Sequence, residues 1–324
     1  MKQPKIFYFC ASVNKALGGH KEIYRHVDIL NKYNYQAFVI HKTKEFKITW
    51  FNHETKIVSL EEFHNVFDKE RDFIVLPEEF GGDILFYSGN KVIFNQNVYY
   101  GYRAFYLQKH EPYSYLHSEL KGVLVVSEHN RKCLNFAYPK LDIFRVCCGV
   151  DLEKFAFQPL SKKKKKIACN PEKRRLDISL LYHVLQSRSE QGLNVLRDYE
   201  WVFIENKAEV EVAQIMQESL IFIFLSKEEG FPLMPLEAMA SGCLVVAYNV
   251  APLTEYVPSD FLFEPGDVIN MARSIEAIAQ SFPEEIDKWE TTSKTSRDIA
   301  LQYSLQRQEE SVIAAWKQIL EKVR

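Results

Sequence analysis

Short apolar stretches recur along the chain and are separated by turns and amphipathic segments. In the first half they are rich in β-branched and aromatic residues, and they lie at 5–10, 36–41, 73–77, 91–96, 123–127 and 143–148. Their nearly continuous apolar character is typical of parallel strands covered on both faces. Between the first two stretches, Ile23, Val27 and Leu30 recur at helical spacing. This order predicts a βαβ unit that opens a doubly wound parallel sheet.

The same pattern starts again after a run of five lysines, Lys162–Lys166. Apolar stretches that read as buried strands follow at 166–169, 201–205, 221–226 and 243–248. The last segment places Leu305, Val312, Trp316 and Ile319 on one face of an amphipathic helix. Two α/β domains of similar architecture are therefore expected, with a helix that closes the chain.

We expect an α/β fold of two Rossmann-like, doubly wound domains that face each other across a cleft. The expected bounds are 1–155 for the first domain and 156–302 for the second. Residues 303–324 form the closing helix, for which packing on the first domain is one arrangement. Ligands bind at the carboxyl ends of parallel strands, so the cleft is the expected site.

Composition narrows the class of protein. The chain has 324 residues, of which 47% are hydrophobic and 26% charged, as in ordinary globular proteins. Its net charge of −2 gives no basic field that would attract nucleic acid. The lysine run is expected to be a solvated loop, and contact with a membrane surface is the alternative.

The cysteines and the termini indicate the compartment. There is no C-x-x-C pair and no histidine at metal-ligand spacing among Cys10, Cys133, Cys147, Cys148, Cys169 and Cys243. No apolar run approaches the roughly 18 residues that span a bilayer, and the first apolar run is too short for a secretory signal. We expect a cytoplasmic protein, and a peripheral position at the inner face of the membrane stays open.

The most informative stretch is EEGFPLMPLEAMASG, which follows a buried strand and precedes another. It separates Glu229 from Glu237 by seven residues, with a loop and the start of a helix between them. Gly230 lets the backbone approach a ligand closely, and helix N-terminal amides form an anion site suited to a diphosphate. The alternative is a loop with two solvated carboxylates, and the stretch alone does not exclude it.

This stretch resembles the E-x7-E signature of the group 1 family of retaining glycosyltransferases, which have the GT-B fold. The resemblance implies that Glu229 contacts the donor sugar and that Glu237 contacts the ribose of the nucleotide. It also implies that the backbone of Gly230, Phe231 and Leu233 lies along the sugar and phosphates. Pro232 departs from the usual glycine and removes one amide donor.

Other segments resemble the family in the same order. Gly18 and Gly19 lie between the first strand and the first helix, like the glycine loop that covers the donor phosphates. The run around Val150, Asp151 and Phe155 resembles the end of the family's first domain, and we interpret it as a hinge.

In the family, an Arg and a Lys form a basic motif after the first strand of the second domain. This sequence departs from that motif. Lys173 and Arg174 are the candidates that would offset charge on the leaving diphosphate, and Arg175 is the alternate. An exposed basic turn is an equal alternative. The resemblance implies activity without a metal, and the sequence has no Asp-x-Asp pair or His/carboxylate cluster that would hold one. No cofactor is expected, since the nucleotide-sugar is a substrate.

The acceptor half is less specific. Candidates are the amides of Asn95, Gln96 and Asn97, which follow a strand at the expected cleft edge, and a merely polar strand end is an equal alternative. Glu78 and Glu79 follow another strand and are expected in a solvated loop, with an acceptor-facing position as the alternative. His20, just after the glycine loop, is a weaker candidate near the phosphates.

The resemblance implies transfer of a sugar from a nucleotide-sugar to an acceptor hydroxyl, with retention of configuration. The acceptor would be a sugar, a lipid-linked glycan or a small molecule. Three alternatives remain: a sugar-nucleotide epimerase, a phosphorylase, or a catalytically degenerate partner subunit that only binds nucleotide. No general base is identifiable in the sequence.

Overall fold

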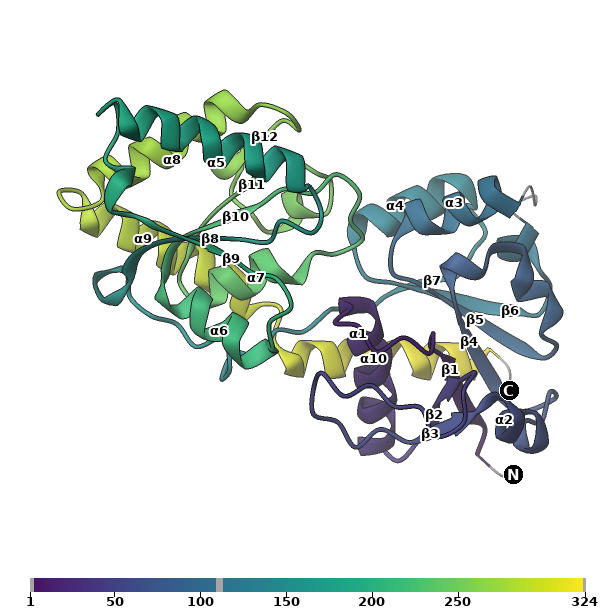
Figure 1. Ribbon diagram of the computed structural model, residues 1–324. Helices are drawn as coiled ribbons and strands as arrows, with labels where there is room; N and C mark the ends of the chain where they lie inside the picture. Colours follow the sequence, from purple (N-terminus) through teal and green to yellow (C-terminus); the bar gives the residue numbers. More distant parts are fainter. Residues whose placement is uncertain (1–2, 109–112, 323–324) are drawn as a thin grey trace. The chain divides into compact units, whose positions relative to one another are not determined.

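The computed structural model describes residues 3–108 and 113–322, and it divides into two compact units (Figure 1). One unit comprises residues 1–148 and 306–324, and we call it the N-terminal domain. The other comprises residues 149–305 and is called the C-terminal domain. Among the described residues, no helix is long and apolar enough to cross a membrane.

The N-terminal domain is built on one parallel sheet. Its strands are β1 (Lys5–Phe9), β2 (Gln36–His41), β3 (Ile57–Ser59), β4 (Phe73–Pro77), β5 (Asn90–Asn95), β6 (Leu120–Val125) and β7 (Ile143–Arg145). They lie in the order β3-β2-β1-β4-β5-β6-β7. The helices are α1 (Gly18–Lys32), α2 (Leu60–Val66), α3 (Val98–Gln108), α4 (Glu128–Ala137) and α10 (Leu305–Glu321). All six strands expected in this half are present, and β3, with three residues, is too short to stand out in the sequence.

Neighbouring residues of each strand point to opposite sides of this sheet, and helices cover both sides. Phe7 of β1 belongs to the same buried core as Val98 of α3 and Leu134 of α4. Tyr8, the next residue, packs on the other face, where its hydroxyl accepts a hydrogen bond from Nε1 of Trp316 of α10 at 2.9 Å. Both tyrosine and tryptophan are fully buried, so this bond satisfies two polar groups within the core.

The C-terminal domain repeats the design with a smaller parallel sheet. Its strands are β8 (Lys164–Cys169), β9 (Glu200–Phe203), β10 (Ser219–Phe224), β11 (Leu244–Tyr248) and β12 (Leu262–Phe263), in the order β12-β11-β10-β8-β9. Its helices are α5 (Arg175–Glu190), α6 (Glu209–Glu218), α7 (Leu233–Ala240), α8 (Val268–Ser281) and α9 (Ile286–Leu301). The expected fold class, two Rossmann-like doubly wound α/β domains, is confirmed.

The lysine run is not a solvated loop throughout, and that expectation was wrong for its second half. Lys164–Cys169 form β8, which pairs with β9 and β10. Lys164 and Lys166 can lie in a strand because a carboxylate on α6 offsets their charges. Oε2 of Glu218 lies 3.0 Å from Lys164 Nζ and 2.8 Å from Lys166 Nζ. Acidic partners on neighbouring elements therefore neutralise the start of this strand.

The boundary between the domains lies a few residues earlier than the expected position at 155. Val150 forms a β-bridge with Ser304, and its N–H donates to the carbonyl of Tyr303 at 2.8 Å. The segment that resembles a hinge thus begins with backbone pairing inside the C-terminal domain, which is why the domain starts at Gly149.

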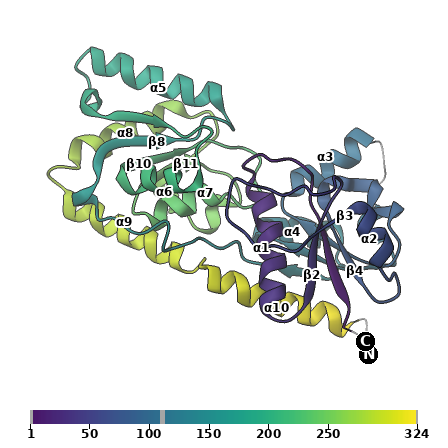
Figure 2. The same ribbon diagram turned by 60° about the horizontal axis from the view of Figure 1, so that its bottom comes forward.

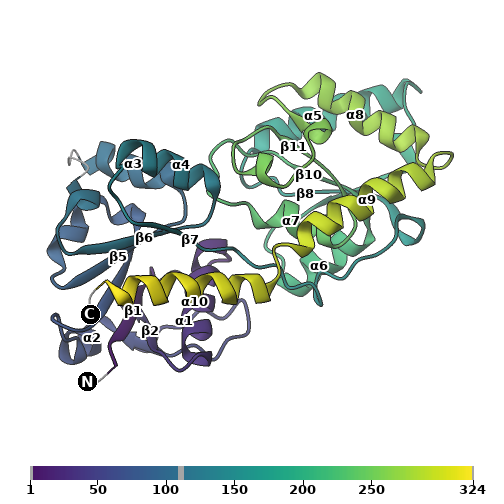
Figure 3. The same ribbon diagram turned by 180° about the vertical axis from the view of Figure 1, so that it is seen from behind.

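The closing helix α10 lies in the N-terminal domain and runs beside α1 (Figures 2 and 3). Lys32 of α1 pairs with Glu309 at 2.7 Å, and buried Gln308 donates to buried Glu22. Together with the Trp316 contact, these interactions attach the helix to α1 and to the sheet. Residues 323–324 of the expected closing helix lie outside the described residues.

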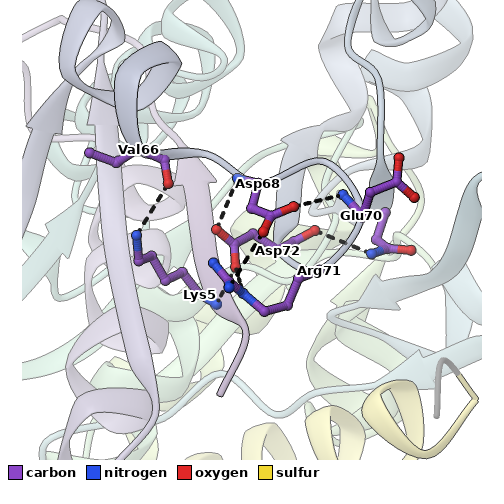
Figure 4. A network of polar contacts seen from close by, with 7 residues as sticks. Lys5, Val66, Asp68, Glu70, Arg71 and Asp72 are labelled. Carbon is purple, nitrogen blue, oxygen red and sulfur yellow. Dashed lines mark hydrogen bonds and ion pairs between the residues drawn. The ribbon is translucent and has the colours of Figure 1, made fainter. Parts of the chain in front are cut away.

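A buried carboxylate fixes the amino-terminal edge of this sheet (Figure 4). Asp72 is fully buried, and its Oδ1 accepts the N–H of Lys5 and Nε of Arg71, both at 3.0 Å. Its Oδ2 accepts the N–H of Asp68 at 3.1 Å. Because a buried charge is tolerated only when it is paired and hydrogen-bonded, this network is structural and holds the start of β1 against the turn before β4.

Candidate functional site

The strand order of the C-terminal domain defines where a ligand should bind. From β8 the chain passes to β9 on one side and then to β10 on the other, so the winding reverses between β8 and β10. In open parallel sheets, ligands bind outside the carboxyl ends of the strands at this reversal. The two loops that leave the sheet here are 170–174, after β8, and 225–232, after β10.

The two loops meet at Glu229. Its side chain is largely buried, and its Oε1 accepts a hydrogen bond from Ser226 Oγ at 2.8 Å. The same oxygen lies 3.1 Å from Nζ of Lys173, whose side chain is 45% exposed. One carboxylate oxygen is thus oriented by a hydroxyl from its own loop and by a cation from the neighbouring loop.

The start of α7 is held firmly next to this carboxylate. The ring of Phe231 packs against the rings of Tyr256 and Tyr303, with centroids 5.3 and 5.4 Å away. The Tyr256 hydroxyl donates to the carbonyl of Pro232, the residue before the helix. These contacts fix the backbone that leads from Gly230 into α7.

The helix itself carries Glu237, which is buried on its second turn. The first loop also contacts α7, because Asn170 Nδ2 donates to the sulfur of Met234 at 3.1 Å. The structure therefore brings Glu229, Lys173 and the predicted donor-binding residues of 230–237 to one edge of one sheet.

Arg174 is engaged differently from Lys173. Its guanidinium binds the carboxylate of Asp177 through two hydrogen bonds, at 3.0 and 3.2 Å. The Tyr248 hydroxyl donates to the same carboxylate at 2.9 Å. Burial opposes the ionisation of Asp177, but the bonds from Arg174 and Tyr248 outweigh it and lower the pKa of this carboxyl. Arg175, the alternate candidate, pairs with Glu205.

Sequence reasoning missed several residues of this edge. Ser226, Asp177 and Tyr248 were not among the predicted residues. Ser226 bonds to the predicted Glu229, Asp177 bonds to the predicted Arg174, and Tyr248 bonds to Asp177. The signal for Ser226 was its position, since it is a polar residue directly after a buried strand. Asp177 and Tyr248 lie 71 positions apart, and nothing in the sequence announces their contact.

In the N-terminal domain the winding reverses between β1 and β4. Gly18 and Gly19 are the first residues of α1, which follows β1. A Cβ placed on Gly19 would lie 2.9 Å from Oε1 of Gln96 in the loop after β5. The predicted glycine loop and the predicted acceptor segment therefore meet within this domain.

Of the three predicted acceptor amides, Asn95 and Asn97 are buried and make contacts within the domain. Asn95 Nδ2 donates to the Tyr115 hydroxyl at 2.8 Å, and its Oδ1 accepts Asn130 Nδ2 at 3.0 Å. The Oδ1 atom of Asn97 accepts the N–H of Tyr99 at 3.0 Å in the first turn of α3. Gln96, which is half-buried, is the one whose side chain lies toward the glycine loop.

Glu78 does not lie in a solvated loop, so that expectation was wrong. It is buried directly after β4, and its Oε1 accepts the N–H of Asn97 at 2.7 Å. Burial raises the pKa of Glu78 to about 8, against the opposing effect of the backbone N–H donors. Glu79 is exposed, as expected. His20 is half-buried, and burial lowers its pKa.

No group of three or more His, Cys, Asp or Glu side chains in residues 3–108 and 113–322 is arranged to hold a metal ion. The six cysteines are free thiols, and Cys10, Cys148, Cys169 and Cys243 are buried. They therefore act as small apolar side chains in the packing of the two domains.

Comparison with known sequences finds similarity to glycosyltransferases within the C-terminal domain. The family described as "Glycosyl transferases group 1" matches residues 198–295, a segment that includes both Glu229 and Glu237. An alpha-1,6-glucosyltransferase of Actinobacillus pleuropneumoniae serotype 7 is 34% identical over 97 residues, which are 29% of this chain and 28% of the relative. The sulfoquinovosyl transferase SQD2 of Arabidopsis thaliana is 31% identical over 110 residues, 29% of this chain and 22% of the relative. Each match thus spans under a third of the curated relative.

Comparison with solved structures covers nearly the whole chain. The sucrose-phosphate synthase of Thermosynechococcus elongatus has a TM-score of 0.68 at 12% identity, over 99% of this chain and 100% of the other. Alr3699/HepE of Anabaena, solved with UDP and glucose, has a TM-score of 0.66 at 15% identity and covers 99% of both chains. At this identity the likeness shows the fold, which is the GT-B fold of two Rossmann-like domains.

Proposed function

We propose that this protein is a glycosyltransferase that moves a sugar from a nucleoside diphosphate sugar to an acceptor hydroxyl. The observation that carries the proposal is the contact of Glu229 with Lys173 at the reversal point of the C-terminal sheet. This contact lies in a domain whose residues 198–295 match a glycosyltransferase family. A buried carboxylate beside a cation suits a ligand that combines sugar hydroxyls with a diphosphate.

The proposed roles follow from position and chemistry. Glu229 accepts hydrogen bonds from hydroxyls of the donor sugar and stabilises positive charge at its anomeric carbon. Glu237 binds the ribose, while the backbone of Gly230, Phe231 and Leu233 follows the diphosphate. Lys173 and Arg174 offset the negative charge that the diphosphate gains as the glycosidic bond breaks, and such contacts stabilise the transition state more than the bound substrate.

Arg174 can take this role only by exchanging a partner, because its guanidinium binds Asp177 in the structure. Lys173 is closer to the proposed chemistry, since its ammonium already contacts Glu229. We therefore assign the larger share of transition-state stabilisation to Lys173.

In the proposed reaction the acceptor hydroxyl attacks the anomeric carbon on the face from which the diphosphate leaves, so configuration is retained. The departing phosphate oxygen takes the proton of the acceptor, and neither a metal nor a cofactor is required. The N-terminal domain binds the acceptor, with Gln96 beside Gly19 as its nearest candidate contact. The acceptor is a sugar or a lipid-linked glycan, and the enzyme acts in the cytoplasm, with the lipid-linked case placing it at the membrane surface.

The test is a panel of nucleoside diphosphate sugars incubated with the full chain and candidate acceptors. Release of nucleoside diphosphate and the mass of the glycosylated acceptor are measured together. UDP-sugars are tried first, because Alr3699/HepE of Anabaena was solved with UDP and with UDP-glucose.

The panel also separates the alternatives. An epimerase would convert the nucleotide-sugar without any acceptor, and a degenerate partner subunit would bind nucleoside diphosphate with no turnover. Thermal stabilisation by the ligand identifies the binding nucleotide, because a ligand at 100 times its Kd adds about 2.7 kcal/mol of stability. Absence of both stabilisation and turnover across the panel would refute the proposal.

A further inference from the structure

We propose that Lys227 contacts the diphosphate of the bound nucleotide, in addition to the cations of the basic turn at Lys173 and Arg174. This inference rests on the proposed function and adds one binding residue to it. It is drawn from the partners of the cations at the carboxyl edge of β8 and β10.

The cations that follow β8, in the loop and at the start of α5, are paired with carboxylates. Lys173 pairs with Glu229 at 3.1 Å, Arg174 binds Asp177 through two bonds, and Arg175 pairs with Glu205. Each of these charges is offset by an adjacent carboxylate before any ligand arrives. A diphosphate would have to displace a carboxylate in order to use one of them.

Lys227 stands in the other loop, directly after Ser226 and two residues before Glu229. It is exposed, and it takes part in no ion pair within 4.0 Å among the residues that the structure describes. Its charge nevertheless acts on Asp177, the carboxylate that binds Arg174, and helps to lower the pKa of that carboxyl. The charges of Lys227 and Arg174 thus act on the same carboxylate from the two loops.

The backbone of Lys227 is held in place although its side chain is exposed. Ser226 and Glu229 are both buried, and the hydrogen bond between their side chains closes the loop around residues 227 and 228. A cation on a fixed backbone position loses less entropy on binding a ligand than one on a mobile loop. The side chain of Lys227 therefore extends from a fixed backbone position two residues before Glu229, where the proposed donor sugar joins its diphosphate.

The cations at this edge differ in their partners. Lys173 and Arg174 have direct carboxylate partners, Glu229 and Asp177, whereas Lys227 has no such partner within 4.0 Å among the described residues. A diphosphate oxygen bound to Lys227 would make a charge-assisted contact without breaking an existing pair.

The test compares nucleoside diphosphate and nucleoside binding by isothermal titration calorimetry, using UDP, GDP, ADP and the matching nucleosides. The variants are Lys227→Ala, Lys227→Arg and, as a matched control, Lys162→Ala. Lys162 is also exposed, but it precedes β8 and so lies at the opposite edge of the same sheet. Thermal melting confirms that each variant is folded.

Lys227→Ala is expected to weaken nucleoside diphosphate binding about tenfold and to leave nucleoside binding unchanged. Lys227→Arg should keep most of the affinity, and Lys162→Ala should match the wild type. If Lys227→Ala behaves like Lys162→Ala, or weakens the nucleoside equally, the inference is overturned while the proposed function stands. If the wild type binds none of the nucleoside diphosphates, the proposed function itself fails.

Discussion

Replacing Glu229 with Gln is the sharpest test of the proposed chemistry, because it removes a charge and changes little else. The glutamine carbonyl occupies the place of Oε1 and still accepts the hydrogen bond from Ser226. What is lost is the ion pair with Lys173 and the negative charge at the proposed anomeric carbon. The two losses have very different sizes.

The effect on stability should be small. The Lys173 side chain is 45% exposed, so water screens its attraction to Glu229. Pairs of this kind contribute about 0–1 kcal/mol, and a loss of that size lowers Tm by a few degrees in a domain of this length. The effect on catalysis should be far larger, because removing one electrostatic contact to the transition state costs about 2.7–4 kcal/mol, or a factor of roughly 100 to 1,000.

The assay is kcat/KM for product formation with the donor and acceptor that the panel identifies, together with a thermal melt of each variant. Glu228→Gln is the matched control, since it makes the same change at the preceding position, where the side chain is exposed. The reasoning would be refuted if Glu229→Gln kept more than about a tenth of the wild-type kcat/KM, a loss below about 1.4 kcal/mol. An equal loss in Glu228→Gln would refute it too, because the charge of the loop would then matter rather than the buried carboxylate.

Four further predictions address other parts of the two domains. Glu237→Ala should weaken nucleoside diphosphate binding, measured by calorimetry, and unchanged affinity would exclude the ribose role. Lys173→Ala should lower kcat by one to three orders of magnitude and Arg174→Ala by less, because the arginine is bound to Asp177; the order would be contradicted if Arg174→Ala were the worse variant. Turnover should persist in EDTA, and its loss with recovery in magnesium or manganese would show that a metal is required. Burial raises the pKa of Glu78 from 4.5 to about 8, so between these values the folded protein keeps a proton that the unfolded chain has lost, and this contribution to stability falls as pH rises. Unfolding of wild type and Glu78→Gln at pH 6 and pH 8 should show the wild type losing more stability, by at most about 1.4 kcal/mol per pH unit.

The fold could be predicted because the signals for it are local. Strands buried on both faces are apolar throughout, and ten such stretches led directly to strands, including β1 and β10. The sequence did not reveal β3 and β12, which have three and two residues and whose pairing depends on the neighbouring strand. It also misled at the lysine run, because the charges of Lys164 and Lys166 are offset by Glu218, a residue more than 50 positions away.

The candidate donor residues, whose role stays a prediction, lie close together for a similar reason. Ser226, Glu229 and Glu237 lie within twelve consecutive residues of one strand–loop–helix unit, so their spacing in sequence nearly fixes their spacing in the structure. Lys173 is the exception, because it comes from another loop. It was chosen because it follows the first strand of the second domain, where the family has its basic motif, and in the structure the reversal of the winding brings the loops after β8 and β10 together.

The acceptor half depends on contacts between segments that are distant in the chain, and this explains why its residues were assigned less well. Glu78 was expected in solvent because it follows a strand, yet it is buried by the turn at Asn97, 19 residues later. Asn95 was expected to meet a ligand, yet Asn130 meets it from 35 residues away. Each of these pairings removes a polar group from solvent, so the polar residues of this edge are mostly used to hold the domain together. Among the three predicted acceptor amides, Gln96 is the one whose side chain lies toward the glycine at position 19, near the reversal point. The family model matches residues 198–295, where the candidate donor residues lie close together in sequence, whereas the structural neighbours cover nearly the whole chain at low identity. Similarity in sequence is therefore found where the spacing of the residues is local, and similarity of fold extends to both domains.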